Sequence, residues 1–188
     1  MSPLLVSYTL WAIWFVSWML AAAWSDRTES APSRSSQLAD RLLVLAGILL
    51  LFGFFPALRS SRLWHFGPSI GWLLTMLTGC GFAFCWWARL HLGRLWSGTV
   101  TRKVGHHVVD SGPYALVRHP IYTGIIIASF ATAIQTGTGA ALAGAVAMTV
   151  GWYLKARLEE RFLRAELGRE AYDAYARRTA MLAPFLKF

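Results

Sequence analysis

The sequence predicts an all-α fold, an integral membrane bundle of about five transmembrane helices with an amphipathic C-terminal helix. The 188 residues are 56% hydrophobic and only 14% charged, which is too apolar and too poor in charge for a soluble domain of this length. The apolar residues form long runs, and roughly 20 such residues make a helix that crosses a hydrocarbon core. Basic residues lie between the runs and in the tail, where they set membrane topology.

The first apolar run, residues 4–24, carries Trp11, Trp14 and Trp18 at helical spacing. Its closing alanines could form a signal-peptide cleavage site, but nothing basic precedes the run except the amino terminus, so we expect an uncleaved anchor. A polar linker over residues 25–40 follows and is expected to lie outside the hydrocarbon.

Four more runs are predicted to complete the bundle. The pair of tryptophans near the end of the third helix is typical of an interfacial belt. Only TGTG separates the last two runs, which predicts a tight helical hairpin. The four runs cover residues 42–58, 69–90, 121–135 and 140–154.

The segment 89–119 is the most densely basic loop of the chain, and the positive-inside rule places it in the cytoplasm. Five spans place the two termini on opposite sides of the membrane, so we expect the N-terminus outside and the C-terminus in the cytoplasm. We expect a bacterial inner-membrane protein. The predicted division is 1–90 for the N-terminal transmembrane helices and 91–188 for a second region that contains the basic loop, the helical hairpin and the C-terminal helix. The net charge of +9 forms no stripe on a soluble fold, so nucleic-acid binding is not expected.

The tail from residue 155 places apolar residues at Leu158, Phe162 and Leu163, as an amphipathic helix leaving the membrane would. Gly168 is predicted to end or bend this helix. Small residues at four-residue spacing on the last membrane helix, Ala143, Ala147 and Gly151, favour close helix packing over a dimer interface. We therefore expect a monomer or a weak homodimer.

A polar, turn-rich segment, GHHVVDSGPYALVRHPIYTG over residues 105–124, interrupts the apolar runs. The predicted hairpin returns the chain to the side it left, so Arg118–Pro120 and the carboxylates of Glu159 and Glu160 can meet at one membrane interface. Such groups are expensive to desolvate and mark a functional site. The alternative is that Glu159, Glu160, Arg157 and Arg161 only solvate a helix end.

Neither a metal site nor a disulfide is predicted. The histidines show no metal-ligand spacing, and Cys80 and Cys85 point to different faces of one helix. His119 precedes a proline, which holds it in an extended conformation.

The polar segment, with WSG at Trp96–Gly98 before it and EERFL from Glu159 after it, resembles the isoprenylcysteine carboxyl methyltransferases and the related phospholipid methyltransferases. The resemblance covers roughly residues 92–188, and Thr179-Ala180 stands where the family has Val-Pro. It implies S-adenosylmethionine as methyl donor, S-adenosylhomocysteine as product and a lipophilic small molecule or membrane lipid as substrate. It implies a cytoplasmic cofactor pocket lined by His106, Tyr114, Val117, Arg118, His119, Pro120 and Tyr122 and closed by Glu159 and Glu160. It implies Arg178, Glu160 and Arg118 as catalytic residues, and Trp96, Tyr172, Tyr175 and Arg178 as substrate-binding residues.

The chemistry leaves two classes of acceptor open. A carboxylate is already ionised at neutral pH, so an arginine such as Arg178 that positions it suffices. An amine must lose a proton before attack, and Glu160, His106 or His107 would have to receive it. We favour the carboxylate of an isoprenylcysteine-like or other apolar acceptor over a phospholipid amine. A non-enzymatic transporter or scaffold is the remaining alternative.

Overall fold

The computed structural model describes residues 1–24, 28–30, 35–54, 62–97, 102–103 and 108–184. Over these residues the chain is predominantly helical, as predicted. Its elements in chain order are α1 (Pro3–Ala22), β1 (Thr28–Ser30), η1 (Ser35–Gln37), α2 (Leu38–Leu51), α3 (Pro68–Leu92), η3 (Gly93–Leu95), β2 (Arg102–Lys103), α4 (Pro113–Leu116), α5 (Pro120–Thr136), α6 (Gly139–Leu167) and α7 (Arg169–Arg178).

The long helices begin and end at residues whose chemistry explains the boundary. Ser2 caps α1 by accepting a hydrogen bond from the Leu5 amide, and Pro3 occupies the first turn, where its missing N–H costs nothing. Gly137, with φ of 75°, ends α5, and the Thr138 side chain caps α6. The predicted TGTG hairpin is therefore confirmed.

Two helix boundaries differ from the prediction. α2 begins at Leu38, inside the predicted polar linker, and ends at Leu51 rather than at residue 58. The linker also contributes β1, which pairs antiparallel with β2 of the basic loop. The fifth apolar run and the amphipathic tail are one continuous helix, α6, which ends at Gly168, where φ is 95°.

Only part of the membrane prediction is supported by helix length and composition. Among the described residues, Pro3–Ala22 and Pro68–Leu95 are long and apolar enough to cross a membrane, and Pro120–Thr136 is a shorter apolar helix. The count of five transmembrane helices stays a prediction. α1 is apolar all round and carries exposed Ile13, Phe15 and Leu20, a pattern that fits a lipid-facing helix.

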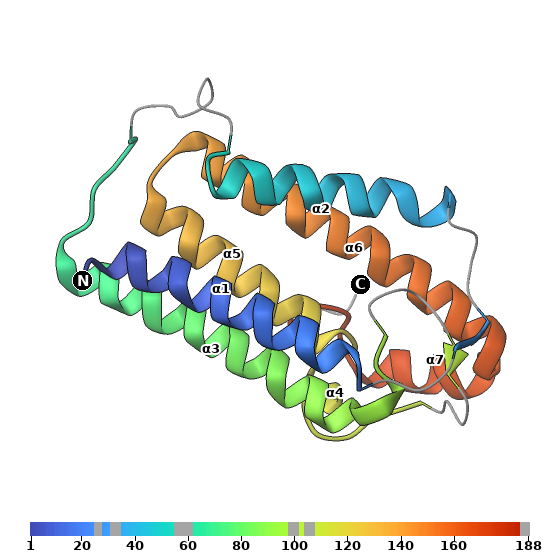
Figure 1. Cartoon of the computed structure of the whole chain (residues 1–188). Helices are drawn as coiled ribbons and strands as arrows, with labels where there is room; N and C mark the ends of the chain where they lie inside the picture. Colours follow the sequence, from blue (N-terminus) through green and yellow to red (C-terminus); the bar gives the residue numbers. More distant parts are fainter. Residues whose placement is uncertain (25–27, 31–34, 55–61, 98–101, 104–107, 185–188) are drawn as a thin grey trace.

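The helices form two groups that pack on each other (Figure 1). α2 lies along α6, while α1 and α5 lie beside α3. Glycines allow the closest approaches: a Cβ on Gly144 of α6 would lie 2.6 Å from the Gly47 carbonyl oxygen of α2, and one on Gly81 of α3 would lie 2.6 Å from the Gly124 carbonyl oxygen of α5. Gly151 contacts α2 in the same way, so this small residue serves packing within the bundle.

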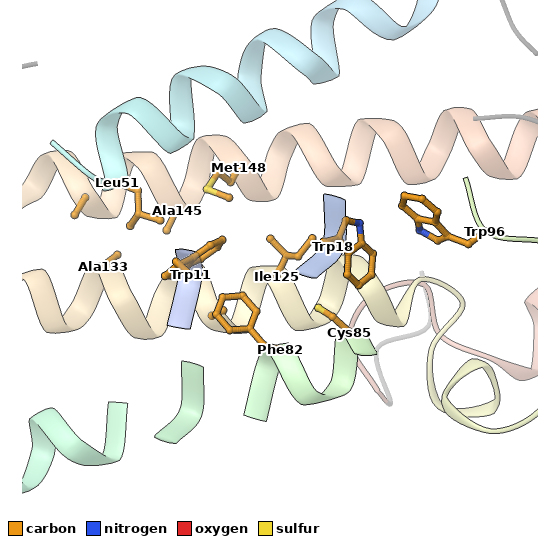
Figure 2. Packing of buried hydrophobic residues seen from close by; sticks show 12 residues of the cluster. Trp11, Trp18, Leu51, Phe82, Cys85, Trp96, Ile125, Ala133, Ala145 and Met148 are labelled. Carbon is orange, nitrogen blue, oxygen red and sulfur yellow. The ribbon is translucent and has the colours of Figure 1, made fainter. Parts of the chain in front are cut away.

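Aromatic and aliphatic side chains fill the space between the two groups (Figure 2). The Trp11 ring of α1 meets Phe82 of α3 edge-on, with centroids 4.9 Å apart, and its indole N–H donates to Thr132 of α5 at 2.9 Å. Ser7 and Gln135 extend this link between α1 and α5, with 2.6 Å between their side-chain oxygens. Satisfied polar groups of this kind hold helices together where apolar contacts alone are non-directional.

The close approach of α3 and α5 predicts opposite effects for two neighbouring glycines. We expect Gly81→Ala to destabilise the protein by about 1–3 kcal/mol, because the new methyl group meets backbone atoms of α5. Gly79→Ala is the matched control, because a Cβ there has only Leu10 Cδ1 nearby, at 3.9 Å. We expect this substitution to leave the unfolding free energy unchanged or to raise it by up to about 1 kcal/mol, because alanine favours the helix more than glycine does. Thermal unfolding in detergent measures both, and equal melting temperatures would contradict the packing.

Candidate functional site

The RHP motif is held in place by the segment that follows α7. Val117 leaves the short helix α4 in an extended conformation and pairs in parallel with Ala180. The Arg118 amide then donates to the Ala180 carbonyl at 2.8 Å, and the His119 amide donates to the Met181 carbonyl at 3.1 Å. His119 has φ of −125° and ψ of 63°, outside the helical region, because Pro120 follows it and begins α5.

Arg118 and Glu160 form a buried ion pair between this motif and α6. Arg118 Nε donates to Glu160 Oε1 at 2.7 Å and Nη2 donates to Oε2 at 3.3 Å. The same guanidinium also donates to the backbone carbonyls of Ala176 and Thr179. The side chains of Arg118 and Glu160 are 7% and 8% exposed, so both charges are largely removed from water and depend on each other.

The predicted meeting of RHP with the two carboxylates is therefore confirmed. Glu160 does not solvate the helix end, as the alternative interpretation required, because it points into the protein. Arg157 and Arg161 do remain exposed and interact within their own helix, with the Tyr153 hydroxyl and the Arg157 carbonyl respectively.

His119 lies between the two carboxylates. Its Nε2 is 3.1 Å from Glu160 Oε1, and its Nδ1 is 3.8 Å from Glu159 Oε2. The Tyr122 hydroxyl donates to the same Glu159 oxygen at 2.7 Å. Burial alone would raise the pKa of Glu160, but hydrogen bonds from His119 and Arg118, together with the charges of these groups, lower it below the ordinary value of 4.5. Glu160 is thus an anion at neutral pH.

Three stacked rings connect the start of α5 with α6: His119, Tyr122 of α5 and Trp152 of α6. The Tyr122 ring lies parallel to His119, with centroids 5.4 Å apart, and stacks on Trp152 at 4.9 Å. The Lys155 ammonium sits over both the Tyr122 ring, at 5.6 Å, and the Trp152 ring, at 5.2 Å, distances at which a cation is attracted to an aromatic face. Sequence reasoning missed Trp152 and Lys155, although with Glu159 they follow the i, i+3, i+7 spacing of one helix face.

α7 adds two tyrosines to the same region. The Tyr175 hydroxyl donates to the Tyr114 carbonyl at 2.7 Å, which fastens α7 to α4. Tyr172 packs edge-on against Tyr175, with centroids 6.1 Å apart. Burial raises the pKa of Tyr114, Tyr172 and Tyr175, so all three hydroxyls stay protonated at neutral pH.

A cavity of about 340 Å³ lies between these groups and the first two helices. Its polar wall consists of Arg118, His119, Tyr122, Lys155 and Glu159. Its apolar wall consists of Trp14, Phe15, Trp18 and Met19 from α1 with Val44 and Ile48 from α2. Phe15 and Met19 are also exposed on the outside, 57% and 50% respectively, so the apolar wall is continuous with the outer surface of α1. Trp96, Tyr114, Pro120, Tyr172 and Tyr175 complete the lining among the predicted site residues.

Three predicted residues, Val117, Glu160 and Arg178, are not part of the cavity lining. Glu160, which the resemblance implies as closing the cofactor pocket, instead binds Arg118 and His119. Val117 is completely buried and holds the strand contact described above. Arg178 does not line the cavity: its side chain is 67% exposed and pairs with Asp110 at 3.2 Å on the surface. His106 and His107 lie outside the described residues. No group of three His, Cys, Asp or Glu side chains that could hold a metal ion occurs in the described part of the chain.

Comparison with known proteins gives one family. The sequence model of the isoprenylcysteine carboxyl methyltransferase (ICMT) family matches residues 73–164, a range that includes Arg118 and Glu160 but ends before α7. Among solved structures, the chain is similar to the eukaryotic intramembrane Ras methyltransferase ICMT, at 19% sequence identity and a TM-score of 0.46. The alignment covers 85% of this chain and 55% of that one, so the chain spans about half the length of this relative. No curated protein matches.

The lowered pKa of Glu160 predicts how stability depends on pH. A carboxyl group whose pKa is lower in the folded than in the unfolded protein contributes stability above the unfolded pKa and loses it as the pH falls through the folded pKa. We therefore expect Glu160→Gln to lower the unfolding free energy by about 3 kcal/mol at pH 7, because Arg118 is left buried without its partner. Below about pH 4 the loss is expected to shrink.

Thermal unfolding in detergent from pH 7 to pH 3.5 measures this difference. Glu170→Gln, in the exposed first turn of α7, is the matched control and is expected to change stability by less than about 0.5 kcal/mol. A Glu160→Gln effect that stays the same at every pH would contradict the ionised pair.

Proposed function

The chain belongs to the isoprenylcysteine carboxyl methyltransferase family, and from this premise we propose that it is an integral membrane methyltransferase that uses S-adenosylmethionine to methylate a carboxylate on an apolar acceptor. The observation that carries the proposal is the shared cavity, in which a charged, aromatic wall faces an apolar wall formed by the first two helices.

The polar wall suits the methyl donor. S-adenosylmethionine carries its reactive methyl group on a positively charged sulfonium sulfur. When the methyl group is transferred, this sulfur becomes the neutral thioether of S-adenosylhomocysteine. Glu159 lines the cavity and offers a carboxylate to the positive ammonium or sulfonium. Glu160, held by Arg118, fixes the orientation of His119, and Glu159 fixes the Tyr122 hydroxyl. Fixed side chains of this kind allow a site to align two reactants.

The apolar wall suits the hydrocarbon part of the acceptor. Trp14, Phe15 and Met19 pass from the cavity to the outer face of α1, so a chain dissolved in the bilayer reaches the cavity without crossing water. Burying that chain is favourable at about 25 cal/mol per Å² of apolar surface. A methyltransferase embedded in the membrane thereby binds an acceptor that a soluble enzyme would have to extract.

Lys155 favours a carboxylate over an amine as the reacting group. Along α6 it lies between Trp152 on one side and Glu159 on the other, so it stands where the acceptor chain meets the donor site. A lysine ammonium attracts a carboxylate and repels a protonated amine. We therefore assign to Lys155 the role of holding the acceptor carboxylate, which sequence reasoning assigned to Arg178. Arg178 is exposed at the surface and does not line the cavity.

The two alternatives are weaker on the same observations. A phospholipid N-methyltransferase would place an ammonium beside Lys155, although Glu159 could receive its proton. A transporter would require charged or strongly polar groups along a path through the membrane, whereas α1 and α5 contain no Asp, Glu, Lys or Arg. The membrane orientation and the inner-membrane location remain expectations from the distribution of basic residues.

Donor binding provides the first test. Calorimetric titration of the detergent-purified protein with S-adenosylmethionine and S-adenosylhomocysteine is expected to show micromolar binding. Glu159→Gln and His119→Ala are each expected to weaken it tenfold or more, about 1.4 kcal/mol, and Glu170→Gln to leave it unchanged. A folded wild-type protein that binds neither compound would refute the methyltransferase proposal.

The acceptor class is tested by transfer of a labelled methyl group. We expect transfer to a prenylcysteine and not to phosphatidylethanolamine, and we expect Lys155→Met to raise the acceptor KM about tenfold while the affinity for S-adenosylmethionine changes little. Arg157→Met, two residues further on the exposed face, is the matched control. Transfer to phosphatidylethanolamine that Lys155→Met increases would establish the amine alternative instead.

A further inference from the structure

Arg89, near the end of α3, is a completely buried cation with 0% exposure. It has no acidic partner among the ion pairs of the described residues. A charge in this situation is expensive unless other groups replace its hydration. The contacts of Arg89 therefore indicate its role in the structure.

Backbone carbonyls at two helix ends supply part of the compensation. Arg89 Nη2 donates to the carbonyls of Ala21, at 2.6 Å, and Trp24, at 3.1 Å, and Nη1 donates to Gly93 at 2.9 Å. The last carbonyls of a helix have no partner within it and carry the negative end of the helix dipole. Arg89 thus joins the C-terminal ends of α1 and α3.

Tryptophan rings supply a further part, while Arg89 Nε is buried with no hydrogen-bond partner among the described residues. The guanidinium carbon lies 3.9 Å from the centroid of the Trp96 ring, 5.7 Å from Trp24 and 6.0 Å from Trp18. Gly93 makes the closest of these contacts possible, because its φ of 58° turns the chain back after α3 and brings Trp96 onto Arg89. A planar guanidinium stacks on such a ring and fixes its plane, as a lysine ammonium does not.

Two of these rings belong to the cavity. Trp96 and Trp18 both line it, and they meet edge-on with centroids 5.5 Å apart (Figure 2). Trp18 in turn stacks on Trp14 at 5.0 Å. Arg89 itself does not line the cavity, so it touches no bound molecule and acts only through the rings.

We propose that Arg89 is a positioning residue that sets the shape of the acceptor side of the cavity by holding Trp96 and Trp18 in place. This inference rests on the proposed function of the cavity. Its consequence is specific: loss of Arg89 changes the fit of the apolar acceptor and leaves the donor site at Glu159, His119 and Tyr122 intact.

Enzyme kinetics separate this role from a merely structural one. We expect Arg89→Met and Arg89→Lys each to raise the KM for the prenylcysteine acceptor about tenfold, with kcat within threefold of wild type and S-adenosylmethionine affinity within twofold. Arg94→Met, an exposed cation in η3, is the control and is expected to leave all three values unchanged. Full rescue by Arg89→Lys, or equal losses in KM, kcat and donor affinity, would overturn the inference.

Fluorine NMR gives a second measurement that needs no activity. In protein labelled with 5-fluorotryptophan, the Trp96 and Trp18 resonances are identified by Trp96→Phe and Trp18→Phe. We expect Arg89→Lys to shift or broaden both and to leave the resonance of Trp64, which is bound to the Ile134 carbonyl at the α5 end, in place. If wild type transfers no methyl group, the proposed function fails and this spectrum still decides the inference. Unshifted Trp96 and Trp18 resonances would overturn it.

Discussion

The buried ion pair between Arg118 and Glu160 is the interaction on which the site depends. Neither charge could be kept away from water alone, because desolvating an unpaired ion costs several kcal/mol. The pair therefore requires that the start of α5 and the later part of α6 meet, which the α5–α6 hairpin makes possible. The guanidinium of Arg118 also donates to the carbonyls of Ala176 and Thr179. The end of α7 and the residue after it are therefore fixed to the same ion pair.

Arg118 and Arg89 show two solutions to the same physical problem. Arg118 is balanced by a carboxylate, which makes its surroundings sensitive to pH and places a second negative group, Glu159, beside the cavity. Arg89 is balanced by carbonyl dipoles and tryptophan faces, which do not titrate. One arginine thus organises the polar wall through charge, and the other organises the apolar wall through ring geometry.

The two walls explain why the proposed reaction belongs in a membrane. A charged methyl donor and a hydrocarbon acceptor favour opposite solvents, and an interface is the place where both are available. The chain meets this requirement with α6, whose Gly139–Leu167 helix runs without interruption from apolar residues to the charged stretch. Trp152, Lys155 and Glu159 then bring the two environments together within two helical turns.

The sequence by itself predicted most of the helices and the α5–α6 hairpin, because apolar periodicity and capping residues are local properties. It allowed RHP to meet the two glutamates, but it equally allowed these carboxylates only to solvate a helix end, and the Arg118–Glu160 pair of the tertiary structure decided between the two. The tertiary structure alone decided that Lys155 and Trp152 face the cavity, that Arg178 lies at the surface and that Arg89 sits against Trp96. These outcomes depend on helix rotation and on which neighbour fills a given space. A basic residue has the same sequence signature in each case, and only packing determines whether its charge meets water, a carboxylate or an aromatic ring.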